Sequence, residues 1–552
     1  MKCVLFIALL LTRVSLLSAE GPITFEPKSS LHLTQEGLLV EAGSAGQFTL
    51  NYPVLVGARW DDVRKPIGKK VSGDTATLQF DGPTRIEVVW QPVEGTLTFT
   101  PIDVPAGVKS LRADMLIDFS YVNAFFHLGI CGFGPCDDYT YIAGRERVYE
   151  WLPAREGEFA SAYHPDAYWN SQALSFHLVN TIRKTGTPYD PAAYTARMIE
   201  RVRKWGFNSI GAFIGGEAGV RRLKNFPYVA HLPLSTWEGF PDVPGAHGIF
   251  DPFSDELREH CDKLFAERLP PAAADPLVIG YFLANEPLWE EIPGAVAALD
   301  SSHPCKRRLA TMLEEKYKTI EAYNRAWETP QGSFAEVATR ALSVKTASAK
   351  KDMQQFTGMF LEAYFRLVRE TFHKYDKNHL LIGNRFQPGT INNETVCQLS
   401  GKYMDLVSFN YYAYGFDAEL LGRIRGWMGD RPMFFSEFYF SSPPDSGLTG
   451  GGKILSSQRA RGLAYRHYVE HAAALGYVVG IEWFTLVDQA TTGRFFEKYN
   501  GEAANTGLIS VADRPWKTML EEMLKTNSDI YKVFFGERPP FVFDDPRFTA
   551  KK

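Results

Sequence analysis

Long apolar runs are scarce in this chain, and this scarcity limits where it can act. After the first twenty residues no stretch of about 18 apolar residues occurs, whereas a helix that crosses a bilayer needs about 20. The N-terminus does carry a short apolar run, Val4 to Leu11, after Lys2 and ahead of Ser18 and Ala19. This pattern is typical of a secretory signal peptide. We therefore expect residues 1–19 to be removed, a secreted or periplasmic location, and no integral membrane segment in the mature chain.

Cysteine is also rare. Of six cysteines, Cys3 lies in the predicted signal peptide, and five remain. An odd number in a large exported protein argues against a disulfide scaffold, so buried free thiols are the expected state, although Cys131 and Cys136 are close enough in sequence to form a bridge. Neither the cysteines nor the twelve histidines have the spacing of a metal site. We expect no metal and no cofactor.

An excess of positive charge is missing as well. Lys and Arg number 59 against 64 Asp and Glu, which gives a formal charge of −5. This balance argues against nucleic acid as a partner. The 552 residues, of which 45% are hydrophobic and 14% aromatic, suit a soluble globular protein of two or three domains. The sequence contains no internal repeat and carries no signal of an oligomeric state.

The segment 20–118 differs from the rest of the chain. Apolar and polar residues alternate there in short runs such as TATLQF and TRIEVVWQ, and turn formers such as Asp81-Gly82 and Gly95 separate the runs. This alternation predicts an N-terminal antiparallel β-sandwich. Its role is either to bind carbohydrate or to serve as a structural cap.

Residues 119–552 alternate strands with helices, which is the pattern of an α/β fold. A helical insert is expected at 306–376. Eight parallel strands with interposed helices close most naturally into a (β/α)8 TIM barrel, whose active site lies at the carboxyl ends of the strands. The expected strands are 125–130, 206–211, 228–234, 277–283, 379–383, 406–409, 433–437 and 478–484.

Two glutamates end strands of this predicted barrel. Glu286 follows the apolar run of the fourth strand and precedes Pro287, and Glu437 ends the seventh strand. A carboxylate at the mouth of a buried strand is unfavourable unless chemistry or a partner uses it. Two carboxylates that face one pocket are typical of the active site of a glycoside hydrolase. We expect Glu286 to act as acid/base, Glu437 to act as nucleophile, and Asn285 to bind a sugar hydroxyl.

Other polar and aromatic side chains follow the strands. Tyr411 or Tyr412, at the end of the sixth strand, is expected to donate a hydrogen bond that keeps Glu437 ionised. Trp483, at the end of the eighth strand, is expected to form the floor of the sugar site. Further polar groups expected at the barrel mouth, where they could bind hydroxyls or acidic substituents, are Glu482, Arg385, Asp488, Gln489 and Arg494.

Asn285-Glu286-Pro287 and Ser436-Glu437-Phe438 resemble clan A glycoside hydrolases, which are retaining TIM-barrel enzymes. Several segments are similar to glycoside hydrolase family 50, the β-agarases. These segments are RVRKWGFNSIGAF (201–213), GIFDPFSDEL (248–257), VIGYFLANEPLW (278–289), KYKTIEAYNRAW (316–327), HLLIGNRF (379–386), GIEWFTLVDQATTGR (480–494) and NTGLISVADRPW (505–516).

The resemblance implies the same roles for Glu286, Glu437 and Asn285, and a β-linked galactan such as agarose as the polysaccharide partner. It also has one departure. Glu482 stands where the agarases are expected to carry a histidine before the tryptophan, and an extra carboxylate at the mouth would repel a sulfated galactan. Alternatives are a β-galactosidase or β-glucanase of the same clan and a pseudo-enzyme that binds polysaccharide without cleaving it.

Overall fold

The computed structural model of the protein describes residues 3–5, 29–33, 37–42, 47–52, 54–56, 63–91, 96–105, 110–112, 115–116, 125–164, 172–215 and 218–549. Contacts between Cα atoms divide the chain into two compact units, Met1–Phe125 and Phe126–Lys552. The boundary expected from the sequence, after residue 118, lies seven residues earlier. Of the predicted signal peptide, only Cys3–Leu5 lies within the described residues.

The N-terminal unit consists of antiparallel strands in three sheets, ordered β1-β10-β9-β8-β7, β11-β5-β6 and β12-β4-β3-β2. Leu31, Leu55 and Trp90, one from each sheet, are buried in one common core. This packing confirms the predicted antiparallel N-terminal domain. Its strands are β1 (Cys3–Leu5), β2 (Ser29–Leu33), β3 (Gly37–Ala42), β4 (Gln47–Asn51), β5 (Val54–Val56), β6 (Val63–Arg64), β7 (Gly68–Ser72), β8 (Thr75–Gln79), β9 (Arg85–Gln91), β10 (Thr96–Ile102), β11 (Ser110–Arg112) and β12 (Met115–Leu116).

The second unit is a TIM barrel. Eight strands of its described residues pair in parallel around a closed ring, and the first pairs with the last, Leu128 opposite Ile481. The ring order follows the chain: β13 (His127–Cys131), β16 (Ser209–Ile210), β17 (Tyr228–His231), β18 (Val278–Asn285), β19 (Leu380–Phe386), β20 (Val407–Asn410), β21 (Met433–Phe438) and β24 (Val478–Phe484).

All eight predicted barrel strands are present, and their ends differ from the expected ones by three residues at most. The prediction works because a strand enclosed on both faces needs an almost continuous apolar run. In the ring, β18 is fourth and β21 is seventh, so the strands that end at Asn285 and Phe438 lie across the barrel mouth from each other.

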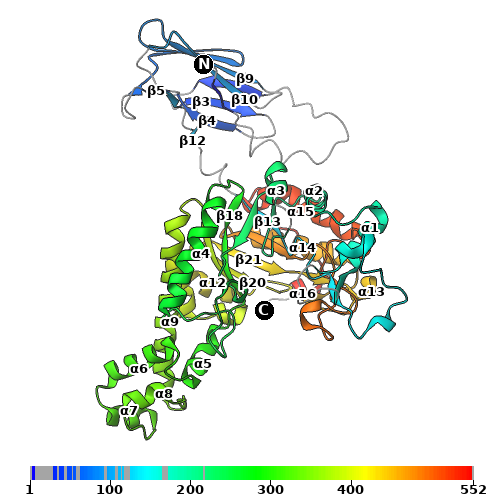
Figure 1. Ribbon diagram of the computed structural model, residues 1–552. Helices are drawn as coiled ribbons and strands as arrows, with labels where there is room; N and C mark the ends of the chain where they lie inside the picture. The colour runs from blue at the N-terminus through cyan, green and yellow to red at the C-terminus, as the bar shows by residue number, and fades with distance from the viewer. Residues whose placement is uncertain are drawn as a thin grey trace. The chain divides into compact units, whose positions relative to one another are not determined.

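Helices surround the barrel (Figure 1). They begin at residues that favour helix starts: Asp190 accepts a hydrogen bond from the Ala193 N–H, and Pro191 occupies the first turn of α2. The helices around the ring and at its ends are α1 (Phe176–Thr185), α2 (Pro191–Lys204), α3 (Ala218–Leu223), α4 (Asp255–Ala273), α10 (Pro388–Ile391), α11 (Glu394–Tyr403), α12 (Ala418–Trp427), α13 (Pro443–Ser446), α14 (Gln458–Ala474), α15 (Lys517–Phe534) and α16 (Pro546–Thr549).

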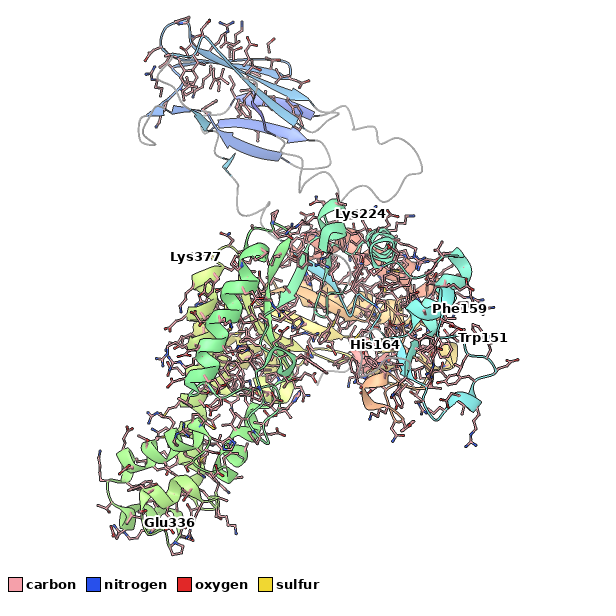
Figure 2. The ribbon with its side chains drawn as sticks, in the orientation of Figure 1. Trp151, Phe159, His164, Lys224, Glu336 and Lys377 are labelled. Carbon is pink, nitrogen blue, oxygen red and sulfur yellow. The ribbon has the colours of Figure 1, made fainter. Side chains whose placement is uncertain are left out.

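The predicted helical insert lies between β18 and β19. Figure 1 shows α6, α7 and α8 projecting away from the barrel, and Figure 2 places Glu336 of α8 at the far end of this projection. The long α9 returns along α4 to the barrel (Figure 1). The helices are α5 (Ile292–Ala298), α6 (Pro304–Tyr317), α7 (Ile320–Trp327), α8 (Phe334–Thr339) and α9 (Ala347–Tyr375).

The connection after β13 forms the opposite side of the second unit. It contains the antiparallel pair of β14 (Tyr139–Tyr141) and β15 (Ala173–Ser175). It also carries Trp151 and Phe159 (Figure 2), whose rings meet edge to face with 5.7 Å between their centroids. Arg145 ties this connection to the loop that follows β24, because its guanidinium donates to the carbonyls of Thr492 and Tyr499.

Among the helices that the structure describes, none has the length and apolar character needed to cross a membrane.

Candidate active site

Glu286 lies directly after β18 in an unusual backbone conformation. Its φ of 46° falls in the left-handed region, which is strained for a residue with a side chain. Pro287 prevents the strand from continuing, and the Glu286 N–H donates to the Arg385 carbonyl at 2.9 Å. The half-buried carboxylate accepts hydrogen bonds from Asn410 Nδ2 at 2.9 Å and from Gln387 Nε2 at 3.0 Å. These contacts aim the carboxylate at the barrel mouth.

Glu437 ends β21 and is held at both oxygens. Oε1 accepts a hydrogen bond from the Tyr412 hydroxyl at 2.5 Å, and Oε2 accepts one from Arg385 Nη2 at 2.8 Å. Its side chain is 12% exposed. Burial raises the pKa of Glu437 above its usual range, and the nearby charge of Glu286 adds to this effect, whereas the Arg385 cation and the Tyr412 hydrogen bond act in the opposite direction.

A short polar chain joins the two carboxylates. Asn410 Nδ2, besides contacting Glu286, lies 3.5 Å from Asn285 Oδ1. Arg385 Nη1 donates to the same Oδ1 at 2.5 Å, and Arg385 Nη2 reaches Glu437. Because arginine only donates, the oxygen of the Asn285 amide must face it, and the Asn285 NH2 group is directed elsewhere. Asn285 is thereby fixed beside Glu286 with hydrogen-bond donors to offer.

Arg385 lies beneath the carboxylate pair. It is fully buried, and its guanidinium also donates to the Ser436 carbonyl at 2.6 Å and to Cys131 Sγ at 3.3 Å. The expectation that Arg385 binds substrate at the barrel mouth is wrong, because no part of its side chain reaches solvent. It positions Glu437 and Asn285 instead.

Glu482 lies deeper still. Its carboxylate accepts a hydrogen bond from the Ala212 N–H at 2.8 Å and lies 3.2 Å from His127 Nε2 and 3.9 Å from Arg385 Nη2. A side chain at Gly211 would collide with it at 2.2 Å. Glu482 is fully buried, so its expected place at the mouth is wrong, and its direct repulsion of a sulfated sugar is no longer supported.

Trp483 and Tyr411 face away from the site. Successive residues of a strand point to opposite sides, so with Glu482 inside the barrel the Trp483 ring points outward. Trp483 is fully buried against Tyr465 of α14, with 5.9 Å between ring centroids, and its Nε1 donates to the Thr506 carbonyl. It cannot be the floor of a sugar site. The Tyr411 hydroxyl accepts from the Asp417 N–H, and only Tyr412 serves Glu437.

The loop after β24 holds the remaining predicted residues. Asp488 is buried, accepts hydrogen bonds from Gly507 N–H and Trp516 Nε1, and has its pKa raised to about 6 by burial. Gln489 is buried and accepts from the Ala504 N–H. Both brace the loop, so the expectation that they bind substrate is wrong.

Arg494, the last of the predicted polar residues, is partly exposed. Its Nη1 lies 3.2 Å from Glu502 Oε2 and 3.7 Å from Asp137 Oδ1. Burial raises the pKa of Asp137 to about 7, and the charge of Glu437 adds to the rise, although Arg494 opposes it. Arg494 thus forms ion pairs with acidic side chains, and substrate binding by Arg494 stays a prediction.

Sequence reasoning missed several residues of the site. Asn410 was visible only as the last residue of the sixth strand, and Gln387 as a loop residue after the fifth. Cys131 ends the first strand, and its buried thiol lies 3.9 Å from Glu437 Oε2. Burial raises the pKa of Cys131 well above the ordinary thiol value.

The five cysteines of the second unit are free, as predicted. Within the described ranges, no group of three or more His, Cys, Asp and Glu side chains could hold a metal ion.

A protein-family model described as β-galactosidase, glycoside hydrolase family 42, matches residues 235–424. Two curated proteins from Vibrio sp. (strain JT0107) are related in sequence. β-Agarase B is 29% identical over 422 residues, which cover 70% of this chain and 42% of that protein. β-Agarase A is 25% identical over 451 residues, which cover 74% and 44%. The chain thus spans less than half the length of the curated relatives it matches.

Solved structures share the fold. The structure of PfGH50B is 23% identical, with a TM-score of 0.64 over 84% of this chain and 67% of that chain. An exo-β-agarase is 21% identical, with a TM-score of 0.62 over 85% and 68%. These comparisons confirm the resemblance of the chain to clan A glycoside hydrolases, and to family 50 β-agarases in particular.

Proposed function

We propose that this relative of the family 50 β-agarases is a retaining glycoside hydrolase that cleaves β-linked galactans such as agarose. The observation that carries the proposal is the linkage of the Glu286 and Glu437 carboxylates, from opposite strands of the barrel, through Asn410, Asn285 and Arg385. The charge of Glu286 contributes to the pKa of Glu437, which supports a single reaction centre. Retaining glycosidases use such a pair of carboxylates.

In the first step, Glu437 attacks the anomeric carbon of the sugar while Glu286 gives its proton to the leaving glycosidic oxygen. The bond from carbon to that oxygen breaks, and a glycosyl ester of Glu437 forms. In the second step, Glu286 takes a proton from water, the water oxygen attacks the same carbon, and Glu437 leaves as a carboxylate. Two inversions restore the starting configuration.

The neighbours of the two glutamates have separate tasks. Arg385 and Tyr412 hold the Glu437 carboxylate and balance its charge during attack and departure. Asn410 and Gln387 orient the Glu286 carboxylate. Asn285 presents its NH2 group to the hydroxyl beside the reacting carbon, where a hydrogen bond that strengthens in the transition state accelerates the reaction.

The direct test is the Glu437→Gln variant, assayed on agarose, porphyran, carrageenan and simple β-galactosides. We expect hydrolysis to be lost while oligosaccharide binding is kept, since the amide has the shape of the carboxylate but is a far weaker nucleophile. Glu419→Gln, at an exposed carboxylate on α12, is the matched control and should retain wild-type turnover. Unchanged turnover of Glu437→Gln would remove Glu437 from the mechanism.

A second candidate is a β-galactosidase, because the family model described by that name covers residues 235–424, which include Glu286 and Arg385. The same substrate panel separates the two. Cleavage of simple β-galactosides without cleavage of agarose would favour the second candidate and leave the roles of the glutamates unchanged.

Export is part of the proposal. The residues Met1 to Ala19 have the composition of a signal peptide. Cys3–Leu5, as strand β1, pairs with Leu97–Phe99 of β10, so cleavage after Ala19 would leave β10 as an edge strand. N-terminal sequencing of the protein recovered from the periplasm or the medium tests this: an N-terminus near Glu20 supports export, and an intact Met1 contradicts it.

A further inference from the structure

Phe213 combines two unfavourable features at the barrel mouth. It lies in the loop after β16 with a φ of 53°, and its side chain is 41% exposed. A bulky side chain in the left-handed region is strained, and a phenyl ring that is 41% exposed gains less from burial than an enclosed one. Such strain persists only where surrounding contacts enforce it, and it concentrates at functional sites.

The contacts that enforce this conformation come from β17 and from the loop after β13. The Phe213 N–H donates to His231 Nε2 at 3.3 Å, and the Phe213 carbonyl accepts from the Phe133 N–H at 3.3 Å. The phenyl ring stacks on the His231 imidazole, with 5.3 Å between centroids and 18° between planes. Burial lowers the pKa of His231 to about 3, and Arg385 contributes, so the imidazole stays neutral and Nε2 remains an acceptor.

The ring is close to the reacting groups. The guanidinium carbon of Arg385 lies 5.0 Å from the centre of the Phe213 ring, and Nη2 of the same guanidinium donates to Glu437 at 2.8 Å. Arg385 is fully buried, so the side of Phe213 that faces it is the inner side. The exposed part of the ring therefore lies on the side away from Arg385, at the carboxyl end of β16.

We infer that Phe213 is the aromatic surface on which the sugar beside Glu437 stacks. This inference rests on the proposed function and adds to it a class of sugar: a pyranose with one apolar face. β-Galactose has such a face, because the C–H groups of C3, C4 and C5 lie opposite its axial 4-hydroxyl. A flat aromatic ring matches that face, while Asn285 and the carboxylates meet the hydroxyls. Phe213 thus takes the place that the sequence assigned to Trp483.

Binding of an agarose hexasaccharide tests the inference. It is measured by calorimetry on the Glu437→Gln protein, so that no turnover occurs. Phe213→Ala and Phe213→Gly should each raise the dissociation constant about tenfold, as expected for the loss of one ring contact. The dissociation constant of Phe213→Tyr should stay within about twofold of that of the parent protein. Phe535→Ala is the matched control, because Phe535 is a 37% exposed phenylalanine at the C-terminal end of α15. Its affinity for the hexasaccharide should be unchanged.

Thermal melting separates folding from binding. Glycine tolerates the left-handed backbone, so Phe213→Gly should melt above Phe213→Ala although both bind weakly. If neither folds, Phe213→Leu keeps apolar volume without a flat face, and weak binding by it supports the inference. Wild-type affinity in the alanine or leucine variant would overturn the inference and leave the proposed hydrolase intact. A wild-type chain that neither binds nor cleaves any galactan would overturn both.

Discussion

The fully buried Arg385 donates from Nη2 to Glu437 Oε2 at 2.8 Å. The other terminal nitrogen of the same guanidinium holds Asn285, the neighbour of Glu286. One buried cation therefore sets the positions of groups from opposite strands of the barrel. This arrangement makes Arg385 a positioning residue whose loss should be visible in the chemistry of Glu437.

Arg385→Met should lower kcat by about 100-fold or more, because removing one partner of a buried ion pair leaves the other unpaired at a penalty of about 3–5 kcal/mol. The Arg385 cation lowers the pKa of Glu437, so its removal raises that pKa further. Since Glu437 must be ionised to attack, the acidic limb of the kcat/KM profile should move to higher pH. Arg423→Met, on the surface of α12, is the control. An unmoved acidic limb would contradict this role.

Tyr412→Phe should reduce kcat by about tenfold or more, since it removes a hydrogen bond to a charged group that is worth about 1.5–3 kcal/mol. The adjacent Tyr411→Phe is a matched control, because the Tyr411 hydroxyl contacts the Asp417 backbone and not the site. Steady-state kinetics of both variants provide the measurement. Equal losses in the two variants would show that the hydrogen bond from Tyr412 has no special part in catalysis.

Glu482→Gln should leave the preference between agarose and sulfated porphyran unchanged, because the buried Glu482 carboxylate cannot touch substrate. It should lower the melting temperature, since the substitution removes the negative charge close to Arg385 and His127. The ratio of kcat/KM values for the two polysaccharides checks the first part. A shift of that ratio toward porphyran would place Glu482 in contact with substrate after all.

Trp483→Phe should destabilise the fold by about 1–3 kcal/mol, because the Thr506 carbonyl loses the shortest of its hydrogen bonds and a small cavity opens against Tyr465. KM for agarose oligosaccharides should stay at the wild-type value. Denaturant unfolding and kinetics measured on the same preparation check both parts. A rise in KM without a loss of stability would restore Trp483 to the sugar site.

The barrel and its carboxylate pair could be predicted because both depend on simple patterns. Buried parallel strands are apolar runs, and Glu286 and Glu437 interrupt such runs at the mouth. The side on which neighbouring residues point was harder to predict. The strand pairing shifts between Phe409 and Asn410, and again between Phe435 and Phe438, so counting from the middle of a strand does not fix the face at its end.

How deeply each polar side chain is buried could not be predicted from the sequence either. Glu482, Asp488 and Arg385 are polar residues near strand ends, and exposure at the mouth was the natural expectation. The structure pairs each of them inside the protein, where hydrogen bonds compensate for burial. The left-handed conformation of Phe213 has no sequence signature at all, since it arises from contacts with Phe133 and His231 on other strands and loops.

The stereochemistry of cleavage tests the central claim most directly. Proton NMR during the first minutes of hydrolysis of a β-linked galactan oligosaccharide identifies the anomer that forms first at the new reducing end. Because Glu437 forms a covalent intermediate and Glu286 then activates water, the β-anomer should appear first, and the α-anomer should follow by slow mutarotation. An α-anomer that appears first would contradict double displacement and the role of Glu437 as nucleophile.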